Sequence, residues 1–183
     1  MSNPSIPMQP GYSGGQGEPT ASRPYMPPDY KIPASKEGML EWGHVRERME
    51  QTRNFWIGTV SADGRPHATP VWGVWLDGAL YFDGSPETRR GRNIAANPAV
   101  VVNLESGEDV VIIEGDAHEV RSPERALTNR LSADYKAEYG SDGYEPEPDQ
   151  WDAGGLYRMR PRVVFAWTKF LLKDATRWRF EGV

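Results

Sequence analysis

The stretch DGRPHATPVWGVWLDGALYF, residues 63–82, decides the fold because two Asp-Gly pairs bracket an apolar run and a second run follows. Asp-Gly is a strong short-range signal for a tight turn between antiparallel strands. The run FWIGTV at 55–60 precedes the first pair and is rich in aromatic and β-branched residues. We therefore predict three strands joined by tight turns into an antiparallel meander.

Four more apolar runs continue this pattern, at 99–106, 108–120, 156–170 and 176–182. Gly115 interrupts the second run and predicts a bulge, since an isolated glycine weakens a strand ladder. About six strands in a mostly meandering order favour a small antiparallel barrel, so the expected fold class is mainly β (α+β).

Helices are predicted around this barrel. Apolar residues between 39 and 49 recur at helical spacing, with Glu and Arg between them. Residues 85–98 predict a short helix, with Ser85 or Thr88 as its N-cap and Asn-Pro at its end. Residues 122–140 predict a longer helix, with Ser122 as its cap and a glycine at its end.

Residues 1–37 form a Pro/Gly-rich arm, and about half of the chain's 16 prolines lie in it. Such a segment buries too little apolar surface to offset the entropy of ordering it. We expect the arm to be disordered or draped over the surface, and the single domain to span 38–183.

Composition excludes several classes of function. The chain has no Cys and a net charge of −5, which removes thiolate metal sites, a Cys nucleophile and a broad basic field for nucleic acid. The three histidines are dispersed, so no metal site is expected. No run has the roughly 20 apolar residues of a membrane helix, and the start lacks the pattern of a signal peptide. We expect a cytoplasmic protein without a membrane partner.

Arg89, Arg90 and Arg92 crowd the start of the helix predicted at 85–98. A helix start carries a partial positive charge, so arginines there are mildly unfavourable without an anion. A bound phosphate would reverse this, because free amides, the hydroxyls of Ser85 and Thr88 and the arginine forks would all serve it. The alternative is that the arginines extend into solvent or pair with acidic neighbours.

A strand ending in Asp83-Gly84 leads into this helix and lies beside a Trp-rich strand. Glycine lets the backbone approach a ligand closely. The combination predicts a ligand with a flat ring at one end and a phosphate at the other. FMN and a deazaflavin phosphate both have this shape.

The segments DGRPHATPVW, GALYF, SPETRRGRNIAANPAVVVNL and VVIIEGDAHEV, in this order, resemble the pyridoxamine 5′-phosphate oxidase-like family of flavin- and deazaflavin-binding split β-barrels. The resemblance covers about residues 40–181. It implies a six-stranded antiparallel split β-barrel with peripheral helices, working as a homodimer with the cofactor at the subunit interface.

The resemblance also implies roles for residues of this chain. Main-chain groups of one strand hold the polar edge of the ring, and backbone after the next strand adds to them. A hydroxyl and basic residues at the short helix bind the phosphate, and an aromatic residue late in the chain lies near the partner's ring. The strand that holds the ring edge matches Thr69, Pro70, Val71 and Trp72, and the backbone after the next strand matches Asp83 and Gly84. The phosphate-binding residues match Ser85, Thr88, Arg89 and Arg90. The late aromatic residue matches Trp167.

One departure bears on the substrate. Family members that oxidise pyridoxamine phosphate carry an Arg and a His two residues apart late in the chain, where this sequence has Phe165 and Trp167. The resemblance therefore implies a flavin- or deazaflavin-dependent oxidoreductase, rather than a true pyridoxamine phosphate oxidase. It would transfer a hydride to or from a small planar organic substrate, with no dedicated catalytic residue identified. Coenzyme F420 is favoured and FMN is the alternative.

Other interpretations remain open. The protein could be a non-catalytic FMN- or F420-binding protein, or a heme-binding protein on the same fold with His67 as the iron ligand. The acidic loop at 141–152 could cover the site through Tyr144 and Trp151, or could be a solvated connection.

Overall fold

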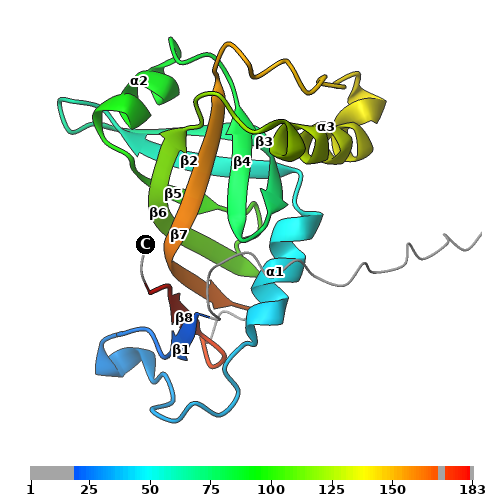
Figure 1. Cartoon of the computed structure of the whole chain (residues 1–183). Coiled ribbons are helices and arrows are strands. Elements are labelled where there is room, and N and C mark those ends of the chain that lie inside the picture. The colour runs from blue at the N-terminus through cyan, green and yellow to red at the C-terminus, as the bar shows by residue number, and fades with distance from the viewer. Residues whose placement is uncertain (1–18, 169–171, 182–183) are drawn as a thin grey trace, which may run out of the picture.

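The computed structural model describes residues 19–168 and 172–181. In this part of the chain, six antiparallel strands close into a barrel, accompanied by two further strands and three α-helices (Figure 1). The strands are β1 (Thr20–Ser22), β2 (Asn54–Val60), β3 (Pro66–Leu76), β4 (Ala79–Asp83), β5 (Ala99–Asn103), β6 (Val110–Glu119), β7 (Leu156–Trp167) and β8 (Thr176–Arg179). The helices are α1 (Trp42–Gln51), α2 (Arg89–Ala96) and α3 (Arg125–Tyr139). The mainly β barrel expected from the sequence is confirmed.

The barrel has the strand order β7-β4-β3-β2-β5-β6, and pairing of β6 with β7 closes it. The two Asp-Gly pairs form the turns between β2 and β3 and between β3 and β4, with Gly64 and Gly78 at positive φ. The ladder between β6 and β7 shifts register between Glu114 and Gly115, so the predicted bulge is confirmed.

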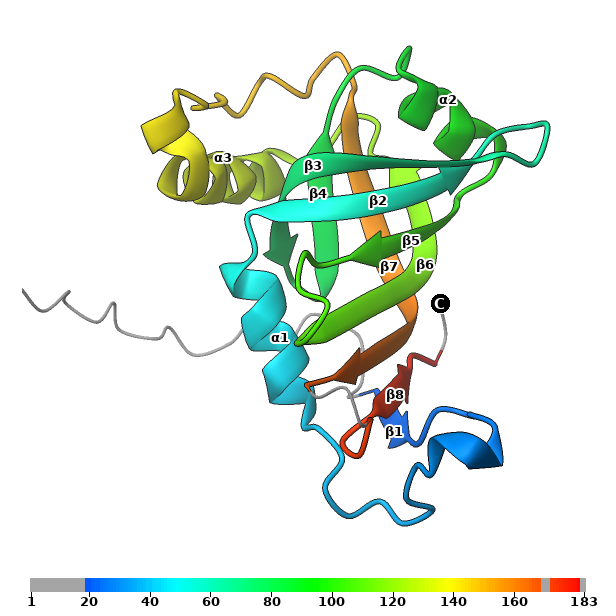
Figure 2. The same ribbon diagram turned by 180° about the vertical axis from the view of Figure 1, so that it is seen from behind.

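Strand β8 pairs with β7 outside the barrel, and β1 pairs with β8 in turn. Both lie at the end of the molecule away from α2 (Figures 1 and 2). Sequence patterns did not predict β1, which comes from the Pro/Gly-rich arm. Residues 1–18 of that arm lie outside the described residues.

Two apolar clusters organise the packing. One fills the barrel, where Phe55, Ile57 and Phe82 are fully buried and α1 contributes Val45 and Met49. The spacing that predicted α1 therefore does mark a buried face.

The second cluster lies between α3 and the outer face of β3 and β4. Helix α3 lies against this side of the barrel (Figure 2). Its start differs from the prediction: the cap is Glu124 and not Ser122, because Ser122 has a left-handed backbone with φ of 51°. None of the helices in the described segments is long and apolar enough to span a membrane.

Candidate cofactor site

The start of α2 is built by hydroxyl groups, as the sequence predicted. Thr88 is the N-cap: its side-chain oxygen accepts from the Gly91 amide at 3.0 Å and donates to the Ser85 carbonyl at 2.8 Å. The Ser85 hydroxyl accepts from the Glu87 amide at 3.1 Å. These bonds order the turn before the helix, so amides and hydroxyls gather at one exposed corner.

The Arg90 side chain turns inward from this corner and does not extend into solvent. One terminal nitrogen donates to the Asp83 carbonyl at 2.9 Å, and the guanidinium lies 5.5 Å from the centre of the Phe82 ring. Its Nε is buried and has no hydrogen-bond partner. Burial is the main influence on the pKa of Arg90, and it lowers that pKa. A buried cationic donor without a partner is costly, and an anion beside it would remove the cost.

Gly84 leaves room for this arrangement. A Cβ at this position would overlap with the terminal nitrogen of Arg90, and the backbone has φ of 147°, which favours glycine. Its amide donates to the Gly155 carbonyl at 3.0 Å. The backbone at Asp83-Gly84 is therefore open to close approach, as predicted, and in this structure the Arg90 guanidinium occupies the space beside it.

Arg89 and Arg92 are exposed on the surface of α2. Arg89 lies close enough to the β2–β3 turn to influence Asp63. The Ser61 hydroxyl is the main cause of the lowered pKa of Asp63, and the charge of Arg89 contributes a smaller part. The three arginines of the motif therefore differ, and Arg90 alone among them reaches the end of β4.

The stretch Thr69–Trp72 lies on a part of β3 that has only one neighbouring strand. β2 pairs with β3 along residues 66–72, whereas β4 pairs with β3 only along Gly73–Leu76. In the described residues, the other edge of Thr69–Trp72 is thus free of strand pairing. This free edge ends next to Asp83, where the turn into α2 begins. Main-chain groups on a free edge can bind the polar edge of a ligand.

Side chains alternate across the sheet at this stretch. Val71 points into the barrel and is buried, while Pro70 and Trp72 lie on the outer face and are exposed. Trp72 stacks on Tyr139 of α3, with ring centroids 4.8 Å apart and planes at 15°. Because Gly73 pairs with Phe82, Trp72 and Asp83 are neighbours on adjacent strands.

Trp167 lies far from these residues within one chain. It occupies the last position of the 12-residue strand β7, whereas Asp83 pairs with the first position, Leu156. About 3.3 Å per residue places the two ends of β7 roughly 35 Å apart along the strand. The other ten predicted residues lie on β3, at the end of β4 and around the start of α2, while the role of Trp167 stays a prediction about a partner subunit.

The loop after α3 packs against the end of β4. Its Tyr144 hydroxyl, Gln150 amide and Trp151 indole all donate to the same carboxylate oxygen of Asp83. Trp151 is only 1% exposed. The loop is therefore a packed part of the protein. The sequence offers Tyr144 and Trp151 as residues that could cover the site, but it carries no signal that the Asp83 carboxylate accepts their hydrogen bonds.

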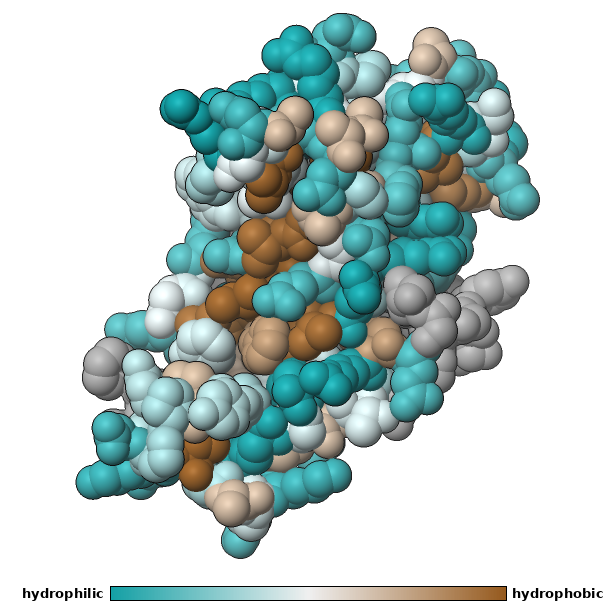
Figure 3. All heavy atoms as spheres, turned by 90° about the vertical axis from the view of Figure 1, so that its left-hand side faces the viewer, coloured by the Kyte–Doolittle hydropathy of each residue, from teal (hydrophilic) through white to brown (hydrophobic). Residues whose placement is uncertain are grey.

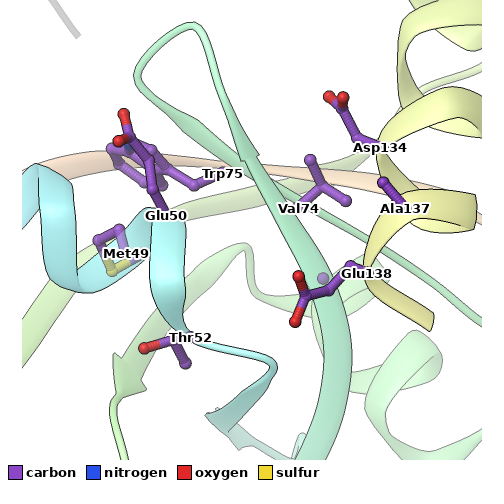
Figure 4. A pocket seen from close by; sticks show the side chains of 9 residues that line it. Met49, Glu50, Thr52, Val74, Trp75, Asp134, Ala137 and Glu138 are labelled. Carbon is purple, nitrogen blue, oxygen red and sulfur yellow. The ribbon is translucent and has the colours of Figure 1, made fainter. Parts of the chain in front are cut away.

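A separate pocket of about 340 Å³ opens between α1, β3 and α3 (Figure 4). Carboxylates of Glu50, Asp134 and Glu138 line it, and no basic residue does. Burial raises the pKa of Asp134, with a smaller contribution from Asp77, while Arg130 opposes the shift. The negative charge makes this pocket unsuitable for a phosphate, which separates it from the corner at α2.

Comparisons with known proteins agree with this fold. Residues 42–180 match the family described as pyridoxamine 5′-phosphate oxidase. A conserved hypothetical protein from Mycobacterium tuberculosis has a similar structure, with 22% identity, a TM-score of 0.61 and coverage of 73% of this chain and 88% of that chain. No curated protein matches the sequence.

Two further solved structures have the same fold. The heme storage protein HutZ from Vibrio cholerae has 21% identity and a TM-score of 0.55, with coverage of 70% of this chain and 94% of that chain. A FAD-binding protein from Mesorhizobium loti has 19% identity and a TM-score of 0.52, with coverage of 76% and 93%. Identities this low show a shared fold alone.

Proposed function

The chain belongs to the pyridoxamine 5′-phosphate oxidase family, and we propose that it is an oxidoreductase that binds a phosphorylated flavin-type cofactor. Coenzyme F420 is the favoured cofactor and FMN the alternative. When bound, either would supply hydride transfer to or from a small planar organic substrate. The residues of the protein would bind the cofactor, orient it and exclude water.

One observation supports this proposal above the others: the unpaired edge of β3 ends beside Asp83, at the turn that leads into α2. The main chain of Thr69–Trp72 is available for the polar edge of a ring because β4 stops pairing at Gly73. The same edge leads to Asp83 and to the buried, unpartnered Nε of Arg90. A ligand with a ring at one end and a phosphate at the other would satisfy both groups at once.

The phosphate would lie at the start of α2. Ser85 and Thr88 hydroxyls and the first amides of the helix are at hand there, and Arg90 would supply the buried positive charge. Arg89 is exposed and would add charge from outside. Gly84 matters because any side chain there would push Arg90 out of its position.

We further propose a homodimer with the cofactor at the interface. Trp56, Trp72 and Val60 are 43%, 38% and 36% exposed on the outer face of β2 and β3. Figure 3 shows that hydrophobic side chains also form a band across one side of the molecule. Apolar surface of this kind marks interfaces. Trp167 would then face the partner's cofactor ring.

The substrate is proposed to differ from pyridoxamine phosphate, because Phe165 and Trp167 stand where that activity uses a basic pair. A non-catalytic binder is the second candidate. Its heme-binding form requires a ligand to iron, and His67, half-buried on β3, is the residue available near the site. Unchanged heme affinity in a His67→Ala variant would exclude direct ligation by this histidine.

Titration of the apo protein with F420 and with FMN, followed by absorbance and fluorescence, tests the proposal. We expect saturable binding of one cofactor, and Arg90→Ala should weaken it at least about tenfold, since a charged hydrogen bond contributes about 1.5–3 kcal/mol. Arg92→Ala is the matched control on the exposed side of α2 and should change affinity less than about threefold. Binding of neither cofactor, or equal affinity in both variants, would contradict the proposal.

A further inference from the structure

Helix α2 packs against the barrel through a buried polar bond as well as apolar contacts, beside the turn that joins β2 to β3 (Figure 2). Ile94 joins the apolar cluster that fills the barrel, and its neighbour Asn93 is only 5% exposed. The Asn93 side-chain amide donates to the Thr59 hydroxyl of β2 at 2.9 Å, and Thr59 is buried too. The other inward-facing residues of β2, Phe55 and Ile57, are apolar. The polar pair is therefore a departure from the pattern of its own strand.

This bond continues to the strand that carries the free edge. The Thr59 hydroxyl donates to the His67 carbonyl of β3 at 3.3 Å, and the two residues are paired across β2 and β3. His67 precedes by two residues the edge Thr69–Trp72, at which we propose that the ring binds. Two consecutive hydrogen bonds therefore connect α2 to the start of that edge.

The place of α2 also sets the place of the phosphate corner. Arg90 lies one turn before Asn93 and on the same side of the helix. A Cβ at Gly91 would lie 2.5 Å from the Pro86 carbonyl oxygen, so the helix and the turn at residues 85–88 are in direct contact. A shift of α2 on the barrel would therefore move the buried guanidinium and the hydroxyl-rich turn together.

A short helix depends on such a bond for its exact place. α2 has eight residues, fewer than an isolated helix needs to be stable in water. Apolar burial holds a helix on the barrel but has no preferred direction. A hydrogen bond has a narrow range of distance and angle, so the bond between Asn93 and Thr59 specifies where α2 lies relative to β2 and β3.

We infer that Asn93 and Thr59 are positioning residues, whose buried bond sets the spacing between the ring end and the phosphate end of the cofactor site. This inference rests on the proposed function, because it takes the ring to lie at Thr69–Trp72 and the phosphate at the start of α2. A ligand that carries both groups binds best when both places are already at the right spacing. A ring without a phosphate binds at one end alone and does not depend on that spacing. The pair therefore favours the phosphorylated form of the cofactor.

Fluorescence titration of the apo protein with FMN and with riboflavin, its phosphate-free counterpart, tests this inference. F420 and its phosphate-free deazaflavin chromophore form the second pair of probes. Asn93→Leu and Thr59→Val each replace a buried polar side chain with an apolar one of similar size. Each should weaken binding of the phosphorylated cofactor about tenfold, and binding of the phosphate-free ring less than about twofold. The double variant should bind as either single variant does, because all three lack the same bond.

Two controls separate positioning from a general loss of structure. Thr59→Ser keeps the hydroxyl and should bind the phosphorylated cofactor within about twofold of the wild type. Ala95→Leu, on the exposed side of α2, should do the same. Melting curves of each variant establish that it is folded.

The outcomes distinguish this inference from the proposed function. A wild type that binds its cofactor overturns this inference alone in either of two cases. One is that Asn93→Leu weakens the phosphorylated and phosphate-free ligands equally, or neither of them. The other is that the effects of Asn93→Leu and Thr59→Val add in the double variant. A wild type that binds neither F420 nor FMN overturns the proposed function.

Discussion

Tyr139 links α3 to the barrel through a single hydroxyl group. This oxygen lies 2.7 Å from the Arg53 carbonyl and 2.9 Å from the Gly73 carbonyl, and it accepts from the Gly73 amide at 3.0 Å. The side chain is fully buried, and its ring also supports Trp72. The phenol therefore satisfies main-chain groups just where β3 passes from one neighbouring strand to two.

A pH dependence of stability follows from this environment. Burial raises the pKa of Tyr139 from 10.0 to about 12. Between these values the unfolded state loses the proton and the native state keeps it, so the free energy of unfolding falls as pH rises from about 10 to about 12 and is fully retained below pH 10. Denaturant unfolding at pH 8, 10 and 11 measures this.

The matched variant for this prediction is Tyr139→Phe. It removes one titrating group, so its loss of stability between pH 10 and 11 should be smaller than in the wild type. It should also be less stable at pH 8 by about 1–3 kcal/mol, because the Gly73 amide loses its buried acceptor. Parallel pH profiles for the two proteins would contradict the role assigned to this hydroxyl.

At the scale of elements, Arg23 fastens the arm to the end of the barrel. Its guanidinium donates to four carbonyls, at 2.6–3.1 Å: those of Ser35, Glu37, Lys173 and Ala175. Two of these belong to the arm and two to the connection before β8. Strand β1 has three residues, and within the described residues β8 is its one partner, so this ladder alone is short for stable docking.

We expect Arg23→Met to release β1 from β8 while leaving the barrel folded. The arm should become sensitive to limited proteolysis between residues 19 and 38, at least about tenfold faster than in the wild type, because two or more charge-assisted hydrogen bonds are lost. Arg46→Met, on the exposed side of α1, is the control. Mass spectrometry identifies the cleavage sites, and equal cleavage rates in the two variants would show that Arg23 does not hold the arm.

At the scale of the whole molecule, the outer face of β2 and β3 exposes large apolar side chains that a soluble monomer would ordinarily bury. Trp56 pairs with Pro70 across the two strands, and both side chains lie on the outer face. A charge placed here would be buried in the proposed dimer and solvated in the monomer. The interface is therefore testable by oligomeric state.

Trp56→Glu should convert the proposed dimer to a monomer at micromolar concentration, as measured by light scattering coupled to size exclusion. Cofactor affinity should fall with it, at least about tenfold, because each site would be incomplete without the second subunit. Tyr25→Glu, at a tyrosine of the arm that is 85% exposed, should change neither quantity. A wild type that is monomeric at high micromolar concentration would refute the dimer.

Local signals were sufficient for the barrel strands and for the presence of the three helices, but not for β1 or for the start of α3. Asp-Gly pairs, alternating apolar residues and the Thr88 cap each act within a few residues, so the meander, the start of α2 and the bulge at Gly115 follow from sequence. The order of motifs also indicated the family. Ser122 failed as a cap because its backbone conformation depends on how the chain leaves β6, which local preference does not encode.

Tertiary structure decided which of the predicted groups act together. Three arginines look alike in the motif, yet Arg90 alone turns inward to the Asp83 carbonyl, where Gly84 leaves room for it, and Arg89 and Arg92 are exposed. The free edge of Thr69–Trp72 exists because β4 is shorter than β3, and Asp83 meets Tyr144 because α3 returns the chain across 61 residues of sequence. Such contacts join distant segments and depend on the closed barrel, whereas turns and caps are made by neighbours along the chain.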